Sequence, residues 1–107
     1  MQTNENPIWS MVETKREAFI GLADRIFDMP EIAYTETRSC AEHTQMLRAE
    51  GFRIKENAAG IPTAVIGEAG QGGPVIAILG EYDALPGLSQ QPGLAEPKMV
   101  DTSGFGH

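Results

Sequence analysis

The sequence predicts part of a mixed α/β domain, with two helices, about three strands and a long loop tail. The apolar residues of the first half recur with helical periodicity. The second half carries short apolar runs that are typical of strands, and most of the 12 glycines and 7 prolines lie there. Because a strand buried on both faces needs helices on both sides, two helices leave the core of such a domain incomplete.

The first predicted helix begins near Pro7 and stops before Pro30. Proline is tolerated in the first turn of a helix and interrupts the pattern at the far end. The apolar residues between the two prolines form one broad stripe at 100° per residue, which predicts one buried face. This stripe consists of Ile8, Val12, Phe19, Leu22, Ala23 and Ile26, widened by Ile20 and Phe27.

A second helix is predicted from about Glu36 to Glu50, with Thr35 as its N-cap and Gly51 as the glycine at its C-terminal end. Cys40 shares a face of this helix with Thr44 and Leu47, so a small buried side chain is favoured over a nucleophile. His43 lies off that face and is expected to be solvated. Because the chain has one cysteine, an internal disulfide is excluded and a reducing cytoplasm is favoured.

Three strands are predicted in the second half. Residues Phe52–Lys55 alternate apolar and polar side chains, and Thr63–Gly67 is a second candidate. The run Val75–Leu79 is continuously apolar, which is typical of a central strand covered on both faces. Gly70–Gly73 is expected to connect adjacent antiparallel strands. A phosphate-binding loop is disfavoured there because Pro74 and a strand follow the glycines, and not a helix.

The charge balance excludes several classes of partner. Acidic residues outnumber basic ones 15 to 8, and a formal charge of −7 argues against nucleic acid or an anionic membrane surface. The charge-free stretch Ala69–Gly80 is glycine-rich and shorter than the ~20 apolar residues that a membrane helix needs. The first ten residues have neither a basic cluster nor an apolar run, so they do not predict a signal peptide.

The candidate site is the acidic segment that follows the apolar run, with Glu81 and Asp83 two positions apart. In open α/β sheets, ligands collect beyond the carboxyl ends of strands. Two carboxylates on such a loop are placed to bind a metal or to orient a metal ligand. The alternative is a solvated acidic loop closed by Pro86 and Gly87, and the spacing alone favours this alternative.

The sequence in and around this segment resembles that of a known family. The stretches GIPTA (60–64) and GQGGPVIAILGEYDALPGLSQ (70–90) resemble the amidohydrolases of the aminoacylase and carboxypeptidase-like metallopeptidase superfamily, and within it the aminobenzoyl-glutamate hydrolases. Upstream, Pro30-Glu31 and the sequence Glu50-Gly51-Phe52 fit the opening of the same family. The resemblance runs from about Ala23 to His107 and agrees in order and spacing.

The resemblance implies roles for individual residues. Asp83 matches the aspartate that orients the metal site of the family, and Glu81 stands where many relatives place a ligand histidine. Gly106-His107 matches the beginning of a later loop, Gly-His-Gly-Cys-Gly-His-Asn, whose cysteine and second histidine supply metal ligands. His107 itself matches a histidine that is not a ligand. Residues 1–107 are therefore expected to be the N-terminal portion of a catalytic domain, truncated before the metal ligands of that loop and without the dimerisation domain of the family.

The family's chemistry implies a divalent metal, Mn²⁺ or Zn²⁺, that activates water and polarises the scissile carbonyl, with a general-base glutamate beyond this chain. The implied substrates are N-acyl amino acids, with p-aminobenzoyl-glutamate as the specific candidate. The isolated chain is expected to be inactive and to hold no metal tightly. A partner hydrolase subunit or self-association is expected. The alternative is a self-sufficient, non-catalytic binding module on the same framework.

Overall fold

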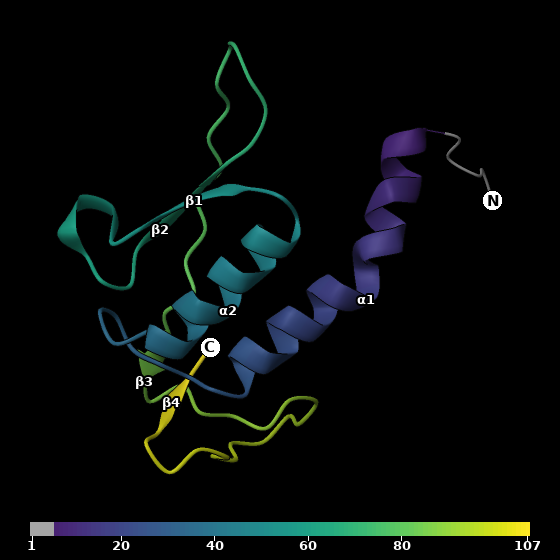
Figure 1. Cartoon of the computed structure of the whole chain (residues 1–107). Helices are drawn as coiled ribbons and strands as arrows, with labels where there is room; N and C mark the ends of the chain where they lie inside the picture. Colours follow the sequence, from purple (N-terminus) through teal and green to yellow (C-terminus); the bar gives the residue numbers. More distant parts are fainter. Residues whose placement is uncertain (1–5) are drawn as a thin grey trace.

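The computed structural model describes residues 6–107 and has the expected mixed α/β composition. Its elements are α1 (Pro7–Phe27), α2 (Thr37–Ala49), β1 (Arg53–Glu56), the short 3-10 helix η1 (Ala58–Gly60), β2 (Val65–Glu68), β3 (Leu85–Pro86) and β4 (Phe105–Gly106). Helix α2 lies at the centre, with α1 beside it and the two small sheets near its opposite ends (Figure 1).

Helix α1 begins and ends where the prolines predict. The side chain of Asn6 accepts a hydrogen bond from the Ile8 N–H at 3.0 Å, and Pro7 occupies the first turn. Only the end of the expected apolar stripe is buried, at Leu22 and Ile26. Helix α2 is 13 residues long and α1 is 21, so the first turns of α1 extend past their neighbour. The predicted stripe is therefore buried only near the C-terminal end of α1.

The members of that stripe that stay exposed are Ile8, Val12, Phe19, Ala23, Ile20 and Phe27. Further along, α2 confirms the second predicted helix, and Gly51 follows it with φ +86°, a conformation that favours glycine. Cys40 and Thr44 are buried, as expected. Thr35 is not the N-cap, because its hydroxyl donates to the Ile32 carbonyl at 2.7 Å. His43 is half-buried, so its expected solvation is also wrong.

Strands β1 and β2 confirm the first two predicted strands within two residues. They pair antiparallel, with Arg53 opposite Glu68 and Glu56 opposite Val65. The connection between them runs through η1, and it buries Ala58 and Thr63. The chain after β2 then leaves the sheet.

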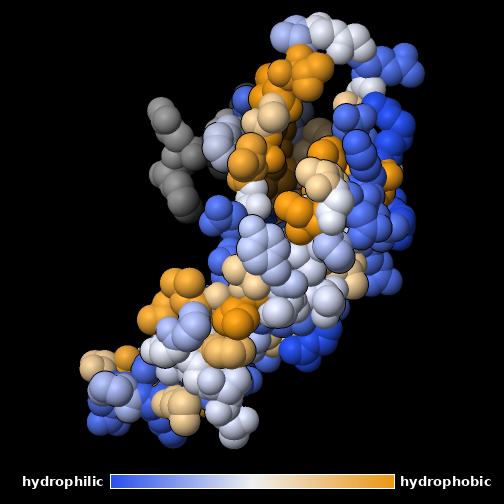
Figure 2. All heavy atoms as spheres, turned by 90° about the vertical axis from the view of Figure 1, so that its left-hand side faces the viewer, coloured by the Kyte–Doolittle hydropathy of each residue, from blue (hydrophilic) through white to orange (hydrophobic). Residues whose placement is uncertain are grey.

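The prediction of a buried central strand at 75–79 is wrong. The large side chains of the run Val75–Leu79 are 84–94% exposed, and no strand among residues 6–107 pairs with it. Gly70–Gly73 lead into this loop and do not connect adjacent strands. Loop 69–80 extends away from the sheet to the top of Figure 1. Figure 2 shows apolar side chains at the same height, exposed along the upper part of the molecule. A strand needs a hydrogen-bonded neighbour, and these residues supply none.

The expected structureless tail contains a short pairing, with Leu85 of β3 opposite Gly106 of β4. The overall dimensions remain extended: the radius of gyration is 16.8 Å, whereas a compact domain of about 100 residues has about 13 Å. Among residues 6–107, no helix is long and apolar enough to cross a membrane.

Candidate functional site

The acidic segment is held beside the turn that precedes α2. Ala84 forms a parallel bridge with Ile32, and its N–H donates to the Glu31 carbonyl at 2.8 Å. The Ala84 residue is 1% exposed, whereas Glu81 is exposed and Asp83 is half-buried. The structure therefore distinguishes the two sequence-predicted carboxylates: Asp83 lies next to a fixed backbone, and Glu81 faces solvent.

Tyr82 fixes the segment from the other side. Its hydroxyl donates to the carbonyl of Thr63, in the connection between β1 and β2. Its ring packs against the imidazole of His43 on α2, with the ring centroids 5.1 Å apart. Burial raises the pKa of the Tyr82 hydroxyl, and the nearby thiol of Cys40 raises it further. The hydroxyl therefore keeps its proton, and stays a donor, to a higher pH than an ordinary tyrosine with a pKa of 10.0.

Glu31 connects this segment to α2. Its carboxylate accepts hydrogen bonds from the Ser39 N–H at 2.7 Å and from the Arg38 N–H at 3.2 Å. The Arg38 guanidinium also contacts it, with Nε 3.2 Å from Oε2. Burial raises the pKa of Glu31, but these hydrogen bonds outweigh burial and leave the pKa below its ordinary value. An ionised carboxylate thus caps the N-terminus of α2, where the helix dipole favours negative charge.

Sequence reasoning missed this group of residues. Glu31 lies eight positions before the amide that it caps, outside the usual N-cap spacing, so no local pattern reveals the contact. The anchoring role of Tyr82 depends on Thr63, which is 19 positions away. The available signal is the Pro30-Glu31 pair shortly before a helix, which the resemblance singled out without giving it a role.

The face of α2 near Tyr82 also carries buried polar atoms without hydrogen-bond partners among residues 6–107. These atoms are Oε1 of Glu36, Oγ of Ser39 and Nδ1 of His43. None of these three residues lines the pocket that Phe27 and His107 line near the end of the chain.

The described residues do not complete a metal centre. Within residues 6–107, no group of three or more His, Cys, Asp or Glu side chains is placed to hold a metal ion. Glu81 and Asp83 are thus not joined by the third ligand that a metal site needs. His107 lies elsewhere, with its ring 6.3 Å from the ring of Phe27.

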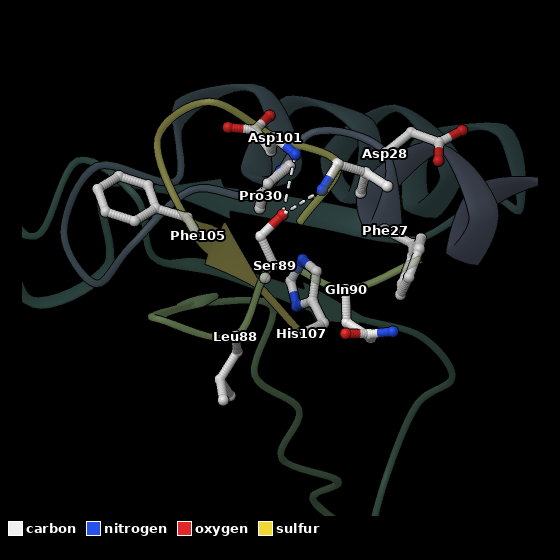
Figure 3. A pocket seen from close by; sticks show the side chains of 11 residues that line it. Phe27, Asp28, Pro30, Leu88, Ser89, Gln90, Asp101, Phe105 and His107 are labelled. Carbon is white, nitrogen blue, oxygen red and sulfur yellow. Dashed lines mark hydrogen bonds between the residues drawn. The ribbon is translucent and has the colours of Figure 1, made fainter. Parts of the chain in front are cut away.

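His107 and Phe27 line a pocket of about 280 Å³ near the end of the chain, and neither Glu81 nor Asp83 lines it. Figure 3 shows Ser89 between Asp101 and His107, with its hydroxyl accepting backbone hydrogen bonds. These come from the Val100 and Asp101 N–H groups, at 3.1 and 2.9 Å. The Ser89 hydroxyl therefore fixes the backbone at Val100 and Asp101. The pocket is formed mainly by the tail of the chain and is separate from Glu81 and Asp83.

The chain is similar to a curated bacterial protein. It is 45% identical over 96 residues to a subunit of the p-aminobenzoyl-glutamate hydrolase of Escherichia coli (strain K12). The match covers 90% of this chain and 20% of that protein, so the chain spans about a fifth of the length of the relative. A 96-residue match in a chain of 107 residues includes Glu81 and Asp83.

This similarity confirms the resemblance expected from the sequence. No family model matches the chain. No solved structure matches it significantly either.

Proposed function

We propose that this chain forms the part of a metal-dependent amidohydrolase that carries the acidic segment 80–87. The whole protein would hydrolyse the amide bond of N-acyl amino acids such as p-aminobenzoyl-glutamate. The observation that carries the proposal is the 45% identity over 90% of the chain to a hydrolase subunit of that name. Because the chain spans about a fifth of that relative, the other catalytic groups would come from outside these 107 residues.

The role that we propose for Asp83 is to orient other groups of the active site. Tyr82 and Ala84 anchor the backbone on either side of it, and its carboxylate is half-buried. A carboxylate held in this way can accept a hydrogen bond without losing side-chain freedom at the moment of reaction. Glu81 is exposed and lacks this support, so we assign it no ligand role.

The proposed metal is Mn²⁺ or Zn²⁺. The described residues do not fit a complete site for either ion, because they bring together fewer than three suitable side chains. The isolated chain is therefore expected to cleave no p-aminobenzoyl-glutamate and to bind neither ion tightly. Cleavage by the isolated chain, with submicromolar metal binding in a calorimetric titration, would contradict the proposal.

A partner subunit and a location in the cytoplasm are also part of the proposal. The relative is named as a subunit, which supports a partner subunit for the whole protein. The buried free thiol of Cys40 supports a reducing cytoplasm. The alternative of a self-sufficient binding module is disfavoured by the exposed run Val75–Leu79, because a finished domain seldom leaves such a run uncovered.

A chimera tests the proposal. The segment of the E. coli protein that matches this chain is replaced by the corresponding residues of this chain, and cleavage of p-aminobenzoyl-glutamate is measured. The chimera is expected to be active. Asp83→Asn in the chimera is expected to lower turnover and metal content by about 10–100-fold, as the loss of an orienting carboxylate does.

Glu96→Gln is the matched control, because Glu96 is an exposed acid on the tail loop and removing its charge leaves its backbone contact with Gln90 intact. This variant is expected to keep the activity of the chimera. Equal losses from Asp83→Asn and Glu96→Gln would remove Asp83 from the site. A chimera that folds with the stability of the parent but has no activity would contradict the amidohydrolase proposal.

A further inference from the structure

Gly106 of β4 lies too close to a neighbouring segment to carry a side chain. It is buried, and a Cβ built on it would lie 2.6 Å from the backbone nitrogen of Ser89 and closer still to the carbonyl group of Leu88. Its φ lies outside the left-handed region, so lack of space requires glycine here, and not the backbone conformation. Among residues 6–107, no other glycine would bring a Cβ within 3.0 Å of an atom elsewhere in the molecule.

The close approach of Gly106 holds the tail, residues 92–107, against the strand that follows Asp83. In the β3–β4 pair, Gly106 is the partner of Leu85, which lies two positions after Asp83 (Figure 1). Ala84, the residue between Asp83 and Leu85, is bridged to the turn that precedes α2. The backbone just after Asp83 is therefore held by two neighbours, and the tail is one of them.

Hydrogen bonds extend this attachment beyond the β3–β4 pair. The Gly104 carbonyl accepts hydrogen bonds from the Gly87 and Ser89 N–H groups, at 3.0 and 3.1 Å. The Ser89 hydroxyl in turn accepts two backbone hydrogen bonds from the tail (Figure 3). Because a hydrogen bond weakens when its atoms separate, this set requires the two backbones to stay as close as Gly106 allows.

The attachment matters for Asp83 because an orienting carboxylate must itself be held in place. A misplacement of about 1 Å by a substitution far from the chemistry can lower the rate about 100-fold. A methyl group at position 106 would push β4 away from Leu88 and displace β3, which pairs with β4. Since β3 begins two residues after Asp83, the displacement would reach the carboxylate through the backbone.

We propose that Gly106 is a positioning residue for the acidic segment. The absence of a side chain lets the tail lie against residues 84–89, and the docked tail holds Asp83 in its orientation. Gly106 takes no part in a chemical step and acts through the backbone that it contacts. The inference rests on the amidohydrolase function proposed above.

Gly106→Ala in the chimera described above, with this chain present through His107, tests the role. Turnover is expected to fall by about 10–100-fold, whereas KM is expected to change by less than about twofold, because the substitution displaces a group that acts on the reaction and not on substrate binding. Gly93→Ala is the matched control, since it adds the same methyl group to the tail where nothing lies within 4 Å. Gly93 has φ +80°, so this alanine strains the tail but leaves the β3–β4 pair untouched, and turnover is expected to stay at the level of the chimera.

Amide hydrogen exchange in the same chimera measures the attachment without relying on activity. The Ala84 N–H, which donates to the Glu31 carbonyl at 2.8 Å, is expected to exchange faster in Gly106→Ala and to stay protected in Gly93→Ala. Ser89→Ala is a second variant, which loosens the tail without adding bulk, for use when Gly106→Ala does not fold. It is expected to change turnover and exchange in the same direction but by less.

Equal turnover of the Gly106→Ala and Gly93→Ala chimeras would overturn the positioning role, and so would equal exchange of their Ala84 amides. When Gly106→Ala does not fold, Ser89→Ala with the turnover and exchange of the unsubstituted chimera would overturn it. A folded chimera without activity would contradict the proposed amidohydrolase function, and the exchange of the Ala84 amide then decides alone whether Gly106 holds the acidic segment.

Discussion

The corner where Glu31, α2 and Ala84 meet is buried although most of its side chains are polar, whereas the run Val75–Leu79 is exposed although all of its side chains are apolar. In the corner, backbone N–H groups and a guanidinium surround the carboxylate, so burial costs little. In the run, nothing within residues 6–107 lies close enough to cover the side chains.

Hydrophobicity alone therefore does not decide which residues of this chain are buried. Among residues 6–107, the buried polar residues are as numerous as the buried hydrophobic ones. The polar ones are Glu31, Glu36, Ser39, Thr44 and Thr63, and side-chain atoms of Glu36 and Ser39 have no hydrogen-bond partner there. A chain of this size with so small an apolar core depends strongly on its hydrogen bonds, because the net stability of a domain is only about 5–15 kcal/mol.

The largest expected effect comes from removing the buried carboxylate. Glu31→Ala leaves the Arg38 and Ser39 N–H groups without their acceptor and is expected to lower the free energy of unfolding by about 2–4 kcal/mol. Urea unfolding followed by circular dichroism measures this loss, and amide hydrogen exchange locates it at the start of α2. Glu17→Ala, at an exposed acid of α1, is the control. Equal unfolding midpoints for the two variants would show that the corner does not hold α2.

A smaller loss of stability is expected when the pH is lowered. Hydrogen bonds hold the pKa of Glu31 below its ordinary value of 4.5, so its contribution to stability is present above that pH. The contribution is lost as the pH falls below 4.5 through the folded-state pKa. Unfolding measured from neutral to acidic pH is expected to show this loss in the wild type and a flatter profile in Glu31→Gln. Because hydrogen bonds from Ser103 lower the pKa of Asp101 in the same direction, both profiles are measured in an Asp101→Asn background. Parallel profiles would contradict the prediction.

Much of the fold could be predicted from the sequence because it is local. Helices α1 and α2, the glycine after α2, and the positions of β1 and β2 follow from periodicity and end signals within a few residues, although the pairing of β1 with β2 was not predicted. The burial of Cys40 could be predicted from its place on a helix face. The exposure of Val75–Leu79 could not be predicted. An apolar run indicates that a strand would be stable if both of its faces were covered, but it does not indicate whether other parts of the chain cover them.

For the candidate site, the sequence predicted the acidic segment but not the residues that hold it in place. The orienting role of Asp83 rests on the resemblance and stays a prediction. The contacts of Tyr82 with Thr63 and of Glu31 with Ser39 join residues that are far apart in the sequence, and single positions carry no sign of them. The half-burial of His43 has the same cause, because it depends on where the Tyr82 ring lies.

A further loss of stability is expected when the hydroxyl of Tyr82, beside this corner, is removed. Tyr82→Phe leaves the carbonyl of buried Thr63 without its donor and is expected to cost about 1 kcal/mol in the free energy of unfolding. Because burial raises the pKa of Tyr82 above its ordinary value of 10.0, the wild type is also expected to lose stability as the pH rises above that value. Tyr34→Phe, at a side chain that is 77% exposed, is the control. Indistinguishable urea midpoints for the two variants would mean that Tyr82 does not anchor the acidic segment.

The smallest effect is expected where polar groups pair without burial. The Arg25 guanidinium on α1 lies 2.9 Å from the Glu42 carboxylate on α2, but the two side chains are 51% and 28% exposed. Solvent weakens the attraction between such charges, so Arg25→Gln is expected to cost only about 0.2–1 kcal/mol. Added salt should reduce that cost further, since it screens the same pair in the wild type. Urea unfolding at low and high salt measures both effects, with Arg16→Gln, a more exposed charge of α1, as control. A loss from Arg25→Gln as large as that from Glu31→Ala would contradict the prediction, because it would show that exposed ion pairs hold the helices as strongly as the buried carboxylate does.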